Sequence, residues 1–284
     1  MAVNKVKILS RLRLIRPINC LMVGFAVIVG AYVAQPRIAI NSSFVNLSLG
    51  FLTGFCLTGA SMAINDYFDR FIDAVNEPSR PIPSGAVKPL EALVYGAILT
   101  ALGLTASLLV NFPSFLAAII AWILFSAYTI RGKRMGFLGN LMVSGCIATP
   151  FIYGSLVIGV FSLNNFLFAA MAFLSNTGRE VIKGIVDTSG DKIHGIKTIA
   201  VLWGEKRAAY VASMLYLCAV ILSTVPWILG LVSIRYLALV GMTDTGFIFT
   251  SIFLSNNPSR ERARRVKRTV LIWMLLAMLA FLSG

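Results

Sequence analysis

Four polar side chains stand together at the end of a long apolar stretch. Asn65, Asp66, Asp69 and Asp73 follow directly on the apolar run 51–64. Residues three or four apart lie about one turn apart on a helix, so these side chains share one face. Because three carboxylates on one helical face repel one another, a bound cation would offset the cost. A divalent ion is the obvious candidate.

A second acidic pair follows another apolar run far downstream. Asp187 and Asp191 repeat the one-turn spacing, and Arg179 and Lys183 precede Asp187 on roughly the same face. Two acidic helix ends and a cationic ladder could together enclose an anion bridged by metal. Carboxylate oxygens, with few protein ligands for each ion, suit Mg²⁺ that is held jointly by protein and phosphate.

Two further acids lie deeper within apolar runs. Glu180 precedes Asp187 by seven residues, and an acid buried in a membrane must be paired. Arg179 or Lys183 could pair with it structurally; alternatively, Glu180 orients the hydroxyl of an acceptor or takes its proton. For Asp244 we expect a hydrogen bond between helices, with cavity lining as the second possibility.

Basic residues in the polar connections have a functional and a topological interpretation. Arg80 lies in a loop that contains Pro78, Pro81 and Pro83. Stiffened by these prolines, the loop could hold the Arg80 guanidinium over the acidic residues to clamp a phosphate. Arg131, which begins a basic stretch, could bind phosphate in the same way or only orient the chain in a membrane.

Composition identifies an integral membrane protein. Hydrophobic residues make up 58% of the 284 residues and charged residues only 13%, which is too little polar residue to cover a soluble globule. The four cysteines are far apart within apolar runs, so no disulfide framework is expected. The single histidine excludes sites that need several histidines.

The apolar runs predict an all-α protein with nine membrane-spanning helices in a single domain, 1–284. A basic amphipathic segment at 1–16 is expected to lie on the anionic membrane surface before the first span. The predicted spans are 18–34, 44–65, 90–110, 114–130, 137–159, 165–186, 206–229, 233–254 and 267–283.

The placement of Lys and Arg supports this topology. With the amino terminus inside, 23 of the 25 basic residues fall on the cytoplasmic side, and only Arg37 and Arg235 fall outside. The net charge of +14 is thereby explained without nucleic acid. Both acidic motifs lie on the cytoplasmic side, and the connections 66–89 and 187–205 are predicted to be long active-site loops. We therefore expect a multi-pass protein of the cell membrane with a cytoplasmic site.

Two segments carry a resemblance to the UbiA superfamily of intramembrane prenyltransferases. One is the first acidic motif, followed by Asn-Glu-Pro-x-Arg-Pro-Ile-Pro-Ser-Gly at 76–85, and the other is Arg179-Glu180-x-x-Lys183 before Asp187 and Asp191. This resemblance covers the whole chain. It implies a nine-helix bundle around a central cavity, with both acidic motifs on the cytoplasmic side binding Mg²⁺ and a prenyl diphosphate.

Within the superfamily, the segments 179–183 and 204–208 are similar to archaeal digeranylgeranylglyceryl phosphate synthases. Chlorophyll synthases share a very similar form of the segment 76–85, and Gly184 stands where the synthase pattern often has an acid. The implied reaction is geranylgeranyl transfer from its diphosphate to the hydroxyl of geranylgeranylglyceryl phosphate. Alternatives are an aromatic or chlorin acceptor and, more distantly, a cation-coupled transporter.

The resemblance also implies roles for individual residues. Catalysis is assigned to Asp66, Asp69, Glu180, Lys183 and Asp187. The remaining assignments are metal binding by Asn65, Asp69, Asp73, Asp187 and Asp191, and substrate binding by Asn65, Asp73, Arg80, Arg131, Arg179 and Lys183.

Overall fold

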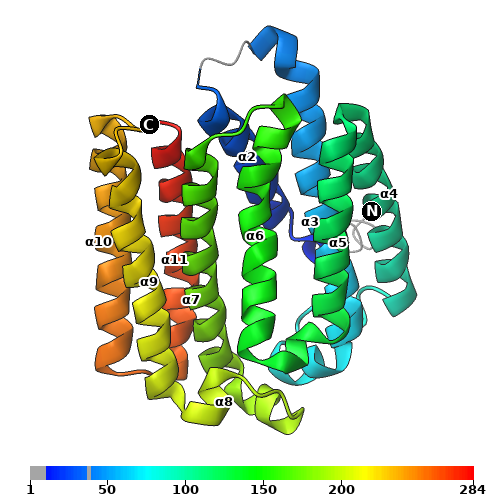
Figure 1. The fold of residues 1–284 in the computed structure, drawn as a ribbon. Coiled ribbons are helices and arrows are strands. Elements are labelled where there is room, and N and C mark those ends of the chain that lie inside the picture. The colour runs from blue at the N-terminus through cyan, green and yellow to red at the C-terminus, as the bar shows by residue number, and fades with distance from the viewer. Residues whose placement is uncertain (1–10, 37–39) are drawn as a thin grey trace, which may run out of the picture.

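The computed structural model describes residues 11–36 and 40–284, and these residues form a bundle of long helices without a strand (Figure 1). A short 3-10 helix, η1 (Gly132–Met135), and a short helix, α8 (Ile199–Trp203), lie in connections at one end of the bundle. The long helices are α2 (Pro17–Ala34), α3 (Ile40–Asn76), α4 (Pro89–Val110), α5 (Phe112–Ile130), α6 (Phe137–Ile158), α7 (Leu163–Ile193), α9 (Glu205–Ile228), α10 (Ile234–Asn256) and α11 (Arg260–Phe281).

Two predicted loops are shorter than the sequence indicated. Helix α3 continues to Asn76 and α7 to Ile193, so the acidic motifs are helical, and the predicted loops 66–89 and 187–205 are wrong at their starts. The remaining connections are 77–88 and 194–204, the second of which contains α8. Within these helical extensions four acidic side chains are buried: Asp66, Asp69, Asp73 and Asp191.

The predicted amphipathic segment 1–16 is described only from residue 11. Residues 11–15 are helical, and Leu14 is completely buried. Arg16 then adopts a left-handed conformation with φ 50°, which ends that helix, and Pro17 begins α2. The chain therefore turns sharply at Arg16, next to the acidic end of α3.

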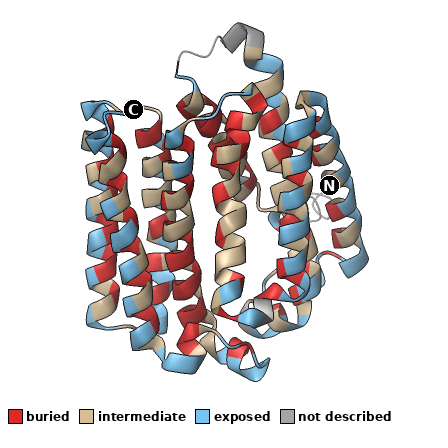
Figure 2. Cartoon of the chain, in the orientation of Figure 1, coloured by how far each residue is buried: buried red, intermediate tan, exposed pale blue. Residues whose placement is uncertain are grey.

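Seven of the described helices are long and apolar enough to cross a bilayer. They are α2, α3, α4, α5, α6, α9 and α10, and many of their large apolar residues are exposed. Figure 2 shows exposed residues along the outer faces of the bundle. Helices α7 and α11 are as long but carry more charged residues. Such an exposed apolar surface is typical of a protein that is solvated by lipid.

Close backbone contacts hold α2, α6 and α7 together. A Cβ on Gly154 of α6 would lie 2.2 Å from the carbonyl oxygen of Val27, so the residue must be small. Asn165 of α7, which is completely buried, donates its amide to the carbonyl oxygens of Gly30 at 2.7 Å and Phe151 at 2.8 Å. These contacts fix three helices that border the central space.

Replacing Gly154 by Ala is expected to destabilise the bundle. The added methyl overlaps backbone atoms of α2, and such overpacking costs about 1–3 kcal/mol. Gly145→Ala is the matched control on the same helix, because its Cβ would meet no atom within 4 Å. Thermal unfolding in detergent should show a lower midpoint for Gly154→Ala and an unchanged or higher one for Gly145→Ala. Equal midpoints would contradict this account of the packing.

Candidate active site

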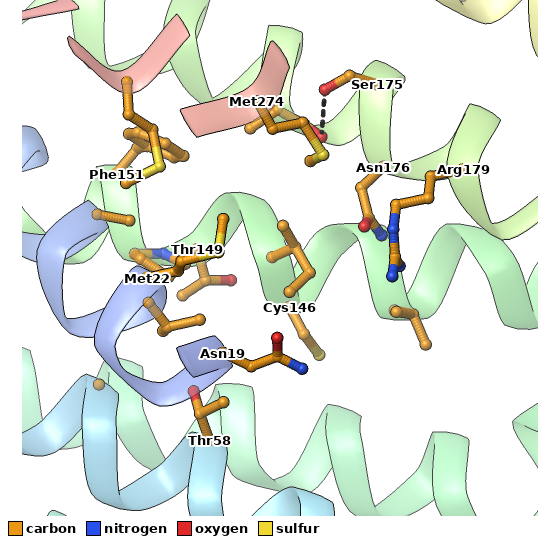
Figure 3. A pocket seen from close by; sticks show the side chains of 18 of the residues that line it. Asn19, Met22, Thr58, Cys146, Thr149, Phe151, Ser175, Asn176, Arg179 and Met274 are labelled. Atoms are coloured by element: carbon orange, nitrogen blue, oxygen red, sulfur yellow. Dashed lines mark hydrogen bonds between the residues drawn. The ribbon is translucent and has the colours of Figure 1, made fainter. Parts of the chain in front are cut away.

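A cavity of about 400 Å³ lies between the helices of the bundle. Its walls come from α2, α3, α5, α6, α7, α9, α10 and α11 and are largely apolar. Figure 3 shows Asn19, Met22, Thr149, Asn176 and Met274 around this space. The charged residues among its lining are Arg16, Arg80, Arg179, Glu180, Lys183, Asp244 and Lys267.

Two arginines hold the carboxylates of the first motif. Arg16 donates to Asp66 at 2.6 Å, and Arg80 reaches Asp73 at 2.5 Å and Asp66 at 3.5 Å. Asp66 and Asp73 are both buried. The repulsion expected between these acids is therefore offset within the protein by guanidinium groups. The sequence places Arg16 only in the basic amphipathic segment and predicts no role for it in the site. Its position directly before Pro17, where the first span begins, could have identified it as a site residue.

Asn65 and Asp69 form a second pair on the same helical face. The Asn65 amide donates to the Asp69 carboxylate at 2.7 Å, one turn away, as the spacing predicts. Asn65 also lines the cavity, while Asp69 is buried behind it. Of the first motif, Asn65 therefore reaches the cavity, and the three carboxylates are buried beside it.

The proline-containing connection after α3 folds back over this acidic face. Backbone hydrogen bonds join Ser84 to Arg80 and Val87 to Pro81, and Ile82 packs in a small apolar cluster with Leu14. Burial by itself would lower the pKa of Arg80, but the Asp73 and Asp66 carboxylates outweigh it and raise that pKa. Arg80 is therefore a fixed cation, in the position that the sequence predicts.

Glu180 is paired as the sequence predicts. Its carboxylate lies 3.3 Å from the Arg179 guanidinium and 3.1 Å from the Lys183 ammonium, and its side chain is only 7% exposed. The Nε of Arg179 is buried and has no hydrogen-bond partner among the described residues. This segment of α7 therefore places two cations around one acid at the cavity wall.

Tyr128 of α5 is buried, lines the cavity, and lies within electrostatic range of both acidic motifs. It interacts electrostatically with Asp69 of α3 and with Asp191 and Lys183 of α7. Helices α3 and α7 also contact one another, so both motifs belong to the same end of the bundle. Tyr128 was not identified from the sequence, because only the fold shows which residue of α5 faces the motifs.

The donor atoms fit a metal ion that is shared with phosphate. Among the described residues, no three His, Cys, Asp or Glu side chains are gathered closely enough to hold a metal by themselves. The pairs Asn65–Asp69 and Asp187–Asp191 each offer hard oxygen donors at one-turn spacing. Mg²⁺ usually takes one or two protein carboxylates and completes its coordination with phosphate and water. The two pairs, which offer only a few protein ligands, therefore suit Mg²⁺ that is bound jointly by protein and phosphate.

Two other predicted residues have clear positions. Arg131 is the C-cap residue of α5, is exposed, and is not among the residues that line the cavity. Asp244 accepts a hydrogen bond from Ser223 of α9 at 2.8 Å, which confirms the predicted bond between helices. Asp244 also lines the cavity, its second predicted role.

Several known proteins are similar to this chain over nearly all of its length. The digeranylgeranylglyceryl phosphate synthase of Methanosarcina mazei is 35% identical and covers 96% of this chain and 97% of its own. That of Thermococcus kodakarensis is also 35% identical, over 94% of each chain. A solved structure described with digeranylgeranylglyceryl phosphate synthase in membranes is 32% identical, with a TM-score of 0.76 over 98% of each chain.

A more distant solved structure shares the fold. It is a UbiA homolog from Archaeoglobus fulgidus bound to GPP and Mg²⁺, 18% identical with a TM-score of 0.63 over 96% of this chain and 99% of its own. The model of the UbiA prenyltransferase family matches residues 23–280, which include both acidic motifs and the cavity helices. This chain therefore belongs to the UbiA prenyltransferase family.

Proposed function

We propose that this protein transfers a geranylgeranyl group from geranylgeranyl diphosphate to the free hydroxyl of geranylgeranylglyceryl phosphate. The products are the second ether bond of an archaeal membrane lipid and diphosphate. The observation that carries this proposal is one apolar cavity with acidic helix ends and fixed cations at the same end. The names of the relatives at 35% identity support the choice of substrates.

The first and second motifs would bind the diphosphate together with Mg²⁺. Asn65, Asp69, Asp187 and Asp191 are the proposed ligands, with Asp66 and Asp73 as ligands or as partners of the ligands. When bound, Mg²⁺ would neutralise charge that develops on the leaving diphosphate. This proposal is supported by the donor atoms of the two motifs and by their common end of the bundle.

Fixed cations would supply the remaining stabilisation of the leaving group. Arg80 and Lys183 line the cavity and are held by carboxylates, so they need no reorganisation during the reaction. Arg131, the exposed C-cap residue of α5, is the third proposed cation for the diphosphate. Departure of diphosphate breaks the allylic C–O bond, and the electron pair leaves with the oxygen.

The acceptor hydroxyl would then attack the allylic carbon and form the ether. Its proton must leave, and Glu180 is the proposed group that orients this hydroxyl or takes the proton. Glu180 lines the cavity and is fixed by Arg179 and Lys183. The apolar walls would exclude water, which would otherwise capture the allylic cation.

The proposed topology has nine spans with the amino terminus and the site in the cytoplasm. Helices α7 and α11 would be the eighth and ninth spans, in addition to the seven that are more apolar. Their charged residues are compatible with a position in the membrane, because several of them line the internal cavity. Except for Arg235, the described basic residues cluster on helix ends and connections at the acidic end of the bundle or face the cavity there. Arg37, Lys5 and Lys7, which also entered this argument, lie outside the described residues. We place the protein in the cell membrane.

The reaction can be tested with purified protein in detergent, Mg²⁺ and the two proposed substrates. Mass spectrometry should detect the double ether phosphate with wild-type protein, and Asp69→Ala and Asp187→Ala should each lose at least about 100-fold in rate, because they remove proposed metal ligands. Glu261→Gln is the control, since this acid is exposed and pairs only with Arg265 among the described residues. Product from an aromatic acceptor instead would overturn the proposed acceptor.

The ion pairs of Arg80 with Asp66 and Asp73 lead to a second prediction. Arg80→Gln removes the cation that bridges Asp66 and Asp73 and should lower kcat/KM for the prenyl diphosphate by about 10- to 100-fold, the range expected for charge-assisted hydrogen bonds. Arg80→Lys keeps the charge but not the fork of donors, so it should recover only part of that loss. Steady-state rates at varied diphosphate concentration measure both. Full activity of Arg80→Gln would remove Arg80 from the site.

A further inference from the structure

Lys267 is the one basic residue of α11 that lines the cavity. Its neighbours Arg264, Arg265 and Arg268 are exposed, whereas Lys267 is partly buried between Val266 and the cavity. A purely topological role would be served by the exposed arginines alone. The position of Lys267 therefore needs another explanation.

Lys267 lies near the two cations of α7, Arg179 and Lys183. It lies within electrostatic range of both and of two acids, Asp187 and Glu77, and it forms no ion pair with any residue in the described part of the chain. Helix α11 packs on α7 here: Val266 and Val270 share an apolar cluster with Ile182 and Val186, and the Arg260 side chain donates to the Val186 carbonyl at 2.9 Å. The packing thus holds Lys267 beside the cations of α7.

Cations and acids meet in this part of the cavity, and Asp187 and Glu77 are the acids nearest in charge interaction to Lys267. Arg179, Lys183 and Lys267 surround Glu180, which contacts the first two directly. The buried Nε of Arg179 still lacks a partner among the described residues, although buried polar groups are normally hydrogen-bonded. This Nε has almost no accessible surface, so an anion in the cavity would meet instead the Lys267 ammonium, which has no ion-pair partner among the described residues.

Lys267 also begins a stripe of apolar residues along α11. Leu271, Met274, Met278 and Phe281 follow it at helical spacing and line the same cavity. At 1.5 Å per residue, this stripe is about 21 Å long. Figure 3 shows Met274 facing the same space as Asn176 and Arg179 of α7. A ligand that lies along α11 would meet a cation at one end and only apolar groups beyond it.

These observations define the chemistry of the occupant. It has an anionic head and a hydrocarbon chain, with the head toward the acidic end of the bundle. Resting on the function proposed above, we propose that Lys267 and Arg179 bind the phosphate of the lipid acceptor, whose chain lies along Leu271 to Phe281 on α11. The acceptor phosphate site is then distinct from the site of the prenyl diphosphate, which lies between the two acidic motifs.

Lys267→Gln tests this assignment through separate KM values. The KM of geranylgeranylglyceryl phosphate should rise about tenfold, since one charge-assisted hydrogen bond is lost, while the KM of geranylgeranyl diphosphate should change less than about twofold. Arg268→Gln removes the same charge from the next residue of α11, which is exposed, and should change neither KM. Lys267→Arg should restore most of the acceptor affinity. A KM that rises equally for both substrates would assign Lys267 to the diphosphate instead and overturn the proposal.

Direct binding separates this proposal from the proposed reaction. Purified protein without Mg²⁺ or prenyl diphosphate is titrated with radiolabelled geranylgeranylglyceryl phosphate and with the same lipid after removal of its phosphate. Wild-type protein should bind the phosphate form more tightly, and Lys267→Gln should lose that preference while its unfolding temperature stays within a few degrees. If binding depends on Lys267 but no product forms, the acceptor phosphate site is supported and the proposed transfer reaction is overturned. Equal binding by both proteins would overturn the site.

Discussion

Buried carboxylates at the end of a membrane helix need cations close by, and this requirement organises the acidic end of the bundle. Asp66 and Asp73 of α3 are buried, and Arg16 and Arg80 pair with them. Removing one partner of such a pair would leave an uncompensated charge, which is strongly destabilising. The sharp turn at Arg16 and the folded connection after α3 are the means by which the chain delivers these two guanidinium groups.

The same requirement explains the polarity of the cavity. The charged residues that line the cavity come from α7, from the start of α11, from Arg16 before α2 and from Arg80 after α3, while the remaining walls are apolar apart from Asp244 and a few polar groups. Asp244 is itself hydrogen-bonded by Ser223. Close packing between α2, α6 and α7, fixed by Gly154 and Asn165, supports one wall of this space. A long apolar cavity with charge at one end suits substrates that have hydrocarbon chains and phosphate heads.

The charge distribution within the cavity is asymmetric. On α3 the acids pair with Arg16 and Arg80, whereas α7 and α11 place three cations near Glu180, with the second acidic motif further along α7. In the proposed function, the two acidic motifs together bind the phosphate that arrives with a divalent cation, and the cations near Glu180 bind the phosphate that arrives without one. A reaction between a prenyl diphosphate and a lipid phosphate needs both kinds of site in a single cavity.

The sequence by itself determined the membrane class, the approximate helix positions and the acidic motifs, because apolar runs and one-turn spacing are local properties. It also predicted the pairing of Glu180 with Arg179 and Lys183, which are near in sequence. It did not reveal the continuation of α3 to Asn76 or the roles of Arg16, Tyr128 and Lys267. The roles of these three residues depend on contacts between positions that are 50 or more residues apart in the sequence, as Arg16 and Asp66 are. Only the packing of helices decides which charges meet, and so where the cavity is polar.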